Sequence, residues 1–101
     1  HELIIADSTS VCLFKALGAA LAFDPERRII LAREEEFPTD LYVADGLGTV
    51  VRAAEERIEE QLDAGTAVLM WSHVDYRSGR RFDMRRFNDA AHAAGALTLW
   101  D

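Results

Sequence analysis

The chain has 101 residues, half of them hydrophobic, and a formal net charge of −7 at pH 7. This length allows one domain or part of one, and the negative charge, without a stripe of Lys and Arg, argues against nucleic acid as a partner. Because Cys12 is the only cysteine, an intrachain disulfide is excluded. The sequence has no apolar run of membrane-spanning length and no signal-peptide pattern, so we expect a cytoplasmic globular protein.

The first half of the chain predicts two strands and a helix. "ELIIA" at 2–6 predicts a strand, and "DSTS" at 7–10 supplies oxygens of the kind that cap a helix. Apolar residues at helical spacing over 11–21 then predict a helix that ends before Pro25. "RRIILA" at 27–32 predicts the second strand. We expect "EEEFPTD" at 34–40 to be a loop, because Pro38 disfavours helix at Phe37.

The second half predicts two helices and two strands. A charged amphipathic helix is expected from Leu41 or Leu47 to Leu62, with Val51, Ala54, Ile58 and Leu62 facing inward. "TAVLMWS" at 66–72 predicts the third strand and "HVDYRSG" at 73–79 a polar loop. A helix over 82–95, capped near Asp83 and stopped by Gly95, leads to a fourth strand at 96–100. The alternation predicts an α/β fold, a mostly parallel sheet with right-handed crossovers and flanking helices.

Ligands of open parallel sheets bind beyond the carboxyl ends of the strands. The residues that follow the predicted strands are therefore the candidate site residues: Ser8, Thr9 and Ser10; Phe37, Pro38, Thr39 and Asp40; Ser72 and His73; and Asp101.

Each candidate has a structural alternative. Hydroxyl residues at a helix N-terminus suit a phosphate, although Ser and Thr are also common helix caps. Phe37 could stack on a planar ligand or plug the core, Asp40 could be only a cap, and His73 is typical of a loop. Asp101 ends a strand expected to be buried, where an unpaired carboxylate is costly and a protonated heterocyclic nitrogen would be a partner. Together, phosphate cradle, aromatic ring and carboxylate predict a site for pyridoxal 5'-phosphate.

Four blocks in order, "DSTSVCLFKAL", "FPTDLY", "SHVDYRSGRRFDM" and "AHAAGALTLWD", resemble the kynureninases, which are pyridoxal-phosphate hydrolases of the aminotransferase class V group. The resemblance covers essentially the whole chain. It implies that Thr9 and Ser10 hold the cofactor phosphate, that Phe37 stacks on the ring within the "FPTD" loop of Pro38, Thr39 and Asp40, that Ser72 contacts the cofactor, and that Asp101 pairs with the ring nitrogen. Two departures are Cys12 and Asp75, where the family usually or often has Asn.

The resemblance also implies a fragment, residues 1–101, of the large domain of a fold type I enzyme. The lysine that forms the Schiff base in this family is expected beyond Asp101, and the sole lysine, Lys15, is expected on a solvated helix surface. No catalytic residue or metal ligand is therefore predicted within the chain, and the isolated chain is expected to be inactive.

The implied full-length enzyme cleaves L-kynurenine, or its 3-hydroxy form, in tryptophan catabolism and the kynurenine pathway to NAD. We expect a homodimer, or self-association through open sheet edges. Two alternatives stay open: another fold type I enzyme such as a cysteine desulfurase, which tends to carry histidine where this chain has Phe37, and a non-catalytic flavodoxin-like module.

Overall fold

A computed structural model describes residues 3, 5, 6 and 8–101. Its four strands form one sheet in the order β2-β1-β3-β4, and every neighbouring pair is parallel. In chain order the elements are α1 (Thr9–Phe23), β1 (Ile29–Arg33), α2 (Pro38–Asp45), β2 (Thr49–Ala53), the 3-10 turn η1 (Glu55–Arg57), α3 (Ile58–Gln61), β3 (Thr66–Trp71), α4 (Met84–Ala93) and β4 (Leu97–Trp100). The predicted α/β class with a parallel sheet is confirmed.

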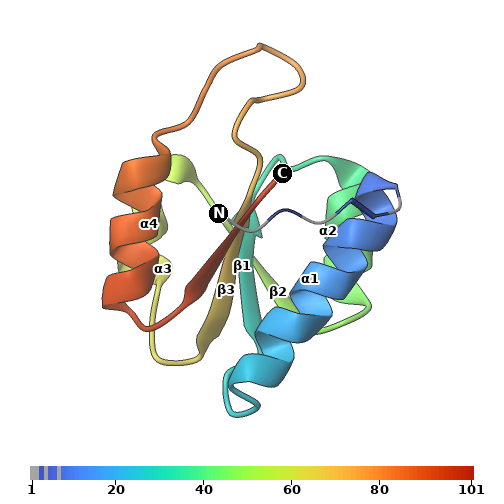
Figure 1. The fold of residues 1–101 in the computed structure, drawn as a ribbon. Coiled ribbons are helices and arrows are strands. Elements are labelled where there is room, and N and C mark those ends of the chain that lie inside the picture. The colour runs from blue at the N-terminus through green and yellow to red at the C-terminus, as the bar shows by residue number, and fades with distance from the viewer. Residues whose placement is uncertain (1–2, 4, 7) are drawn as a thin grey trace.

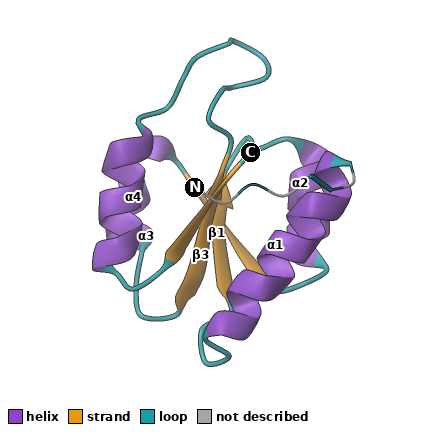
Figure 2. Cartoon of the chain, in the orientation of Figure 1, coloured by secondary structure: helices purple, strands orange, loops and turns teal. Residues whose placement is uncertain are grey.

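The helices cover both faces of the sheet. Figures 1 and 2 show α1 and α2 on one side and α3 and α4 on the other, which gives three layers. Successive strand residues point to opposite faces, so β1 sends Ile30 and Ala32 toward α1 and Leu31 toward α4. Both faces of β1 and β3 are therefore apolar, as expected for strands with helices on either side.

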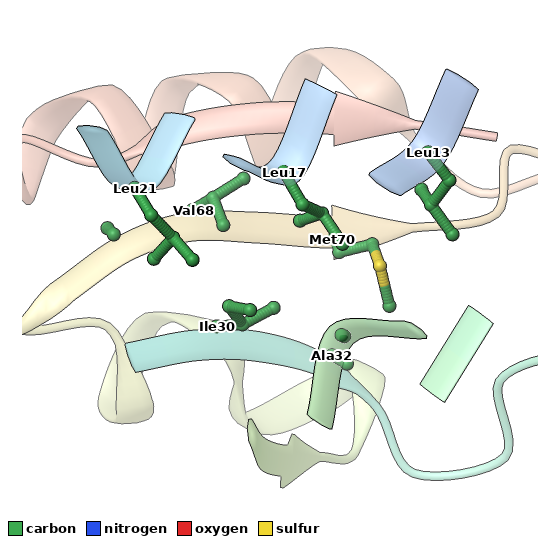
Figure 3. Packing of buried hydrophobic residues seen from close by; sticks show 9 residues of the cluster. Leu13, Leu17, Leu21, Ile30, Ala32, Val68 and Met70 are labelled. Atoms are coloured by element: carbon green, nitrogen blue, oxygen red, sulfur yellow. The ribbon is translucent and has the colours of Figure 1, made fainter. Parts of the chain in front are cut away.

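The core beneath α1 follows the predicted spacing of its leucines. Leu13, Leu17 and Leu21 lie on one face of the helix and pack on Ile30, Ala32, Val68 and Met70 of β1 and β3 (Figure 3). The second cluster, beneath α4, is built around Trp71, Phe82 and Phe87, whose rings meet at centroid distances of 4.9–6.3 Å. These two clusters hold the strand ends, and hence the loops that follow them, in fixed positions.

Most predicted elements are confirmed. The helix over 11–21, the strands at 27–32, 66–72 and 96–100, and the helix after Asp83 all form within a few residues of the predicted bounds. The side chain of Asp83 accepts a hydrogen bond from the backbone N–H of Arg86, as a helix cap does, and Gly95 follows the helix with a φ of +81°. The strand predicted at 2–6 falls partly outside the described residues; Leu3, Ile5 and Ala6 are described, exposed and in no strand.

The helix predicted from Leu41 or Leu47 to Leu62 is wrong. Residues 49–53 form β2, which pairs in parallel with β1 from Ile29↔Thr49 to Arg33↔Ala53. The run Thr49, Val50, Val51 is β-branched and therefore fits a strand better than a helix. Of the predicted helix, residues 41–45 form the end of α2, and residues 58–61 form α3, a single turn that buries Ile58.

The loop predicted over 34–40 is shorter than expected, because Pro38 opens a helix. Proline lacks a backbone N–H, and the first position of a helix needs none, so Pro38 occupies the first turn of α2 while Phe37 precedes it with extended backbone (φ −54°, ψ 126°). Asp40 consequently lies in the first turn of a helix, and its position is fixed. Among the described residues, no helix is long and apolar enough to cross a membrane.

Candidate functional site

A cavity of about 380 Å³ lies beyond the carboxyl ends of β1, β3 and β4. This volume is within the range of roughly 300–1,000 Å³ that is usual for small-molecule sites. The cavity is lined by Thr9, Ser10, Phe37, Asp40, Ser72, Val74, Tyr76 and Asp101. Six of the eight residues predicted to bind a cofactor therefore meet in one place, although they come from four separate segments of the chain.

The N-terminus of α1 contributes two hydroxyl residues. Ser8 is the helix cap, since its Oγ accepts a hydrogen bond of 3.4 Å from the backbone N–H of Val11. Thr9 and Ser10 begin the helix itself and line the cavity. Backbone N–H groups in the first turn of a helix have no partner within the helix, and the helix dipole is positive there. This end of the cavity is suited to an anion such as a phosphate.

Aromatic side chains form one wall. The Phe37 ring meets the Tyr76 ring edge to face, with centroids 5.1 Å apart and an interplanar angle of 87°. Both residues are about half exposed and line the cavity, so aromatic surface is available to a ligand there. Tyr76 and Val74 belong to the loop predicted over 73–79, which sequence reasoning treated as a recognisable block without giving it a place in the site.

Asp101 and Ser72 are held side by side by the pairing of β3 with β4. The N–H of Asp101 donates to the carbonyl of Trp71 (3.1 Å), and the N–H of His73 donates to the carbonyl of Asp101 (2.9 Å). Asp101 itself is exposed, and β4 is only partly buried. The expected burial of Asp101 is therefore not met within residues 1–101, where its side chain is open to solvent.

Asp40 is the buried carboxyl of the site. It is 3% exposed, and its buried Oδ2 atom accepts no hydrogen bond from an N–H or hydroxyl of the described residues. Burial, a hydrogen bond with the Asp101 carboxyl and the negative charges of Asp101 and Glu36 together raise the pKa of Asp40 to about 7. Asp40 and Asp101 thus form a pair of interacting carboxyl groups at one end of the cavity.

The remaining predicted residues lie outside this cavity. Thr39 is exposed at the start of α2, and Pro38 instead borders a larger hollow of about 740 Å³ beside α2 and β2. That hollow is lined largely by charged side chains and contains no other predicted site residue. His73 lies next to Trp100, with ring centroids 6.2 Å apart, rather than on the cavity.

An ion pair fixes the loop that carries Tyr76. Nη2 of Arg33, at the end of β1, donates to Oδ1 of Asp75 at 3.1 Å, and both side chains are largely buried. Asp75 also accepts hydrogen bonds from the Ser78 hydroxyl (2.7 Å) and the Arg77 N–H (3.3 Å). Asp75 thus organises the turn of its loop, and its negative charge has a guanidinium partner that the sequence did not reveal.

Glu36 is a second residue that sequence reasoning missed. It is the last of three consecutive glutamates, and such a run suggests a solvated surface. A turn closed by the Glu36 N–H and the Arg33 carbonyl (3.2 Å) directs it inward, so that Glu36 is 3% exposed while Glu34 and Glu35 remain at the surface.

Comparison with known proteins gives a consistent result. No protein-family model matches the chain. The chain is 46% identical over 107 residues to a kynureninase of Deinococcus radiodurans, 38% identical over 112 residues to one of Pseudomonas fluorescens and 41% identical over 112 residues to one of Burkholderia mallei. These alignments cover 99–100% of this chain and 26–27% of each relative. The chain is thus kynureninase-like along its whole length, and it spans about a quarter of the length of the curated relatives that it matches.

Proposed function

We propose that the chain is a segment of the cofactor-binding large domain of a kynureninase. The full-length enzyme would hydrolyse L-kynurenine to anthranilate and L-alanine, or the 3-hydroxy form to 3-hydroxyanthranilate and L-alanine. The observation that carries the proposal is the cavity, which brings hydroxyl groups at a helix N-terminus, an aromatic ring and two carboxyl groups together from distant segments. The similarity to named kynureninases supports the same activity.

The chemistry of the cavity fits pyridoxal 5'-phosphate. Thr9 and Ser10, with the positive end of α1, would bind its phosphate, and Phe37 would stack on its ring. The Oδ2 atom of Asp40 and the carboxylate of Asp101 would accept a hydrogen bond from, and keep protonated, the ring nitrogen. When bound, the cofactor supplies an electron sink for cleavage of the substrate. Ser72 would contact the cofactor, while Pro38 and Thr39 would form the start of the helix that carries Asp40.

The covalent attachment of the cofactor is assigned to another segment. Lys15 is the only lysine of the 101 residues, and it lies exposed on α1 and does not line the cavity. We therefore expect residues 1–101 alone to bind the cofactor without a covalent bond and to cleave no kynurenine. The longer protein that contains this segment is the one to assay.

Kynurenine cleavage by the full-length protein tests the proposal, with anthranilate release as the measurement. We expect Asp101→Ala and Asp101→Asn to lower kcat by about 100-fold or more, because the ring nitrogen loses the charge that keeps it protonated. Asp89→Asn removes an exposed carboxyl on α4, away from the cavity, and serves as the control. Near-normal turnover in both Asp101 variants would remove the assigned role.

We also propose that the protein associates with a second copy. The described sheet ends at β4, and beside it lies an apolar groove of about 350 Å³ lined by Ala16, Ala19, Ala20, Phe23, Val68, Leu97, Thr98 and Leu99. Phe23 is 78% exposed there, and a strand edge beside apolar surface favours pairing with another chain. Light scattering of residues 1–101 at micromolar concentration should give more than the monomer mass; a clean monomer would contradict this.

A further inference from the structure

Glu36 lies behind the cavity and touches two of its residues. Its carboxylate is buried, and among the described residues it accepts hydrogen bonds from Phe37 and Ser72. Oε1 accepts from the Phe37 N–H at 3.0 Å and from the Ser72 hydroxyl at 2.5 Å, while Oε2 accepts from the Ser72 N–H at 2.8 Å. One side chain therefore ties the loop after β1 to the residue that follows β3.

These contacts determine what Ser72 can offer to a ligand. A serine hydroxyl has one hydrogen to donate and two lone pairs that accept. Because the hydrogen of Ser72 is donated to Glu36, only its lone pairs remain for the cavity. Ser72 lines the cavity together with Asp40 and Asp101, so this end of the cavity presents acceptors, whereas the α1 end presents donors.

We propose that Glu36 is a positioning residue that fixes Ser72 as a hydrogen-bond acceptor and holds Phe37 at the ring-binding wall. This inference rests on the proposed function for the identity of the ligand, a phosphorylated aromatic cation. A ligand with an anionic group at one end and an N–H or O–H donor at the other fits the cavity in one orientation only. Glu36 acts through its neighbours and does not line the cavity itself.

The substitution Glu36→Gln separates this role from simple packing. Glutamine has the same shape, but only one of its two terminal atoms accepts hydrogen bonds. The Ser72 N–H and the Phe37 N–H point at different oxygens of Glu36, so one of them must face the amide NH₂ and lose its partner. Glu34→Gln makes the same chemical change on an exposed side chain of the same loop and is the matched control.

The test measures dissociation constants of pyridoxal 5'-phosphate for the full-length protein by quenching of tryptophan fluorescence. We expect Glu36→Gln and Ser72→Ala each to weaken binding about tenfold, the usual effect of losing one hydrogen bond to a charged group. If Glu36 acts through Ser72, the double variant should also be about tenfold weaker rather than about a hundredfold, because residues that act as a unit are not additive. Glu34→Gln should match the wild type.

Binding within about twofold of wild type in Glu36→Gln, or losses that multiply in the double variant, would overturn the inference and leave the proposed function standing. Absence of any cofactor binding by the wild type would instead defeat the proposed function. In that case amide hydrogen exchange at Ser72 in the cofactor-free protein still tests whether Glu36 positions Ser72. Exchange should be faster in Glu36→Gln than in Glu34→Gln, and equal exchange would refute the positioning role. Should Glu36→Gln fail to fold, Ser72→Ala alone decides, and unchanged cofactor affinity would overturn the inference.

Discussion

The carboxyl of Asp40 should make the cofactor-free protein less stable as the pH rises. In the folded protein burial raises its pKa to about 7, against 3.8 in an unfolded chain. Between these values the folded state keeps a proton that the unfolded state releases, so the free energy of unfolding falls as pH increases and levels off above about pH 7. The higher pKa in the folded protein lowers the free energy of unfolding above pH 7 by about 4 kcal/mol. This figure is an upper limit, because the neighbouring Asp101 carboxyl shares the titration.

Asp40→Asn should remove this penalty. Its amide resembles the protonated acid and can donate a hydrogen bond toward the neighbouring carboxylate of Asp101. We expect the stability advantage of the variant over wild type to grow by about 3 kcal/mol from about pH 5 to about pH 8. About two pH units of that interval lie below the pKa of Asp40, and it is there that the free energy of unfolding of the wild type falls with pH. The same variant should bind pyridoxal 5'-phosphate more weakly, because the negative charge that would face the ring nitrogen is gone.

Urea unfolding of the cofactor-free protein at the two pH values measures the difference. Groups that titrate equally in both proteins cancel in the comparison of wild type with Asp40→Asn. Asp45→Asn, at the exposed end of the same helix, controls for the loss of one negative charge. A stability difference between wild type and Asp40→Asn that is the same at both pH values would refute the reasoning.

Three further predictions concern the wall, the loop and the core. Phe37→Ala should weaken cofactor binding by about tenfold in a fluorescence titration, because the ring would lose its stacking surface, whereas Phe37→Tyr should bind nearly as wild type; equal binding by all three would contradict the stacking role. Hydrogen bonds from Ser78, the Arg77 N–H and Arg33 lower the pKa of Asp75 to about 2. The loop over 73–79 should therefore lose protection from hydrogen exchange as pH falls from about 4 toward 2. Asp75→Asn should abolish that pH dependence, and persistence of the dependence in this variant would count against the ion pair. Leu17→Ala should lower the free energy of unfolding by about 2–5 kcal/mol, and Ala in place of the exposed Leu97 by far less; a similar loss at both positions would contradict the packing shown in Figure 3.

The sequence predicts the fold best where one signal dominates. The leucines of α1 recur at helical spacing, the cap at Asp83 and Gly95 bracket α4, and β1 and β3 are continuous apolar runs. Between residues 41 and 62 two signals compete, because Val51, Ala54, Ile58 and Leu62 also fit a helix. Pairing with β1 decides in favour of a strand, and this long-range contact cannot be read from local spacing.

The sequence predicts which residues form the candidate site better than it predicts which of their carboxyl groups are buried. Thr9, Ser10, Phe37, Asp40, Ser72 and Asp101 meet because parallel strands end at a common edge, which the alternation of elements indicates. The burial of Asp40 depends on Pro38 starting a helix, and that of Glu36 on a turn after β1. Neither burial has a local sequence signal. The pattern of the sequence therefore predicted a desolvated carboxyl at Asp101 and not at Asp40.

The protonation of the ring nitrogen tests the central proposal most directly. Pyridoxal 5'-phosphate labelled with ¹⁵N in the ring can be bound to the full-length protein, and its nitrogen chemical shift recorded at a pH where the free ring nitrogen is largely unprotonated. A cavity with Asp40 and Asp101 at its ring end should give the shift of a protonated pyridinium, and the Asp40→Asn, Asp101→Asn double variant that of an unprotonated ring. An unprotonated nitrogen in the wild-type complex would contradict the account.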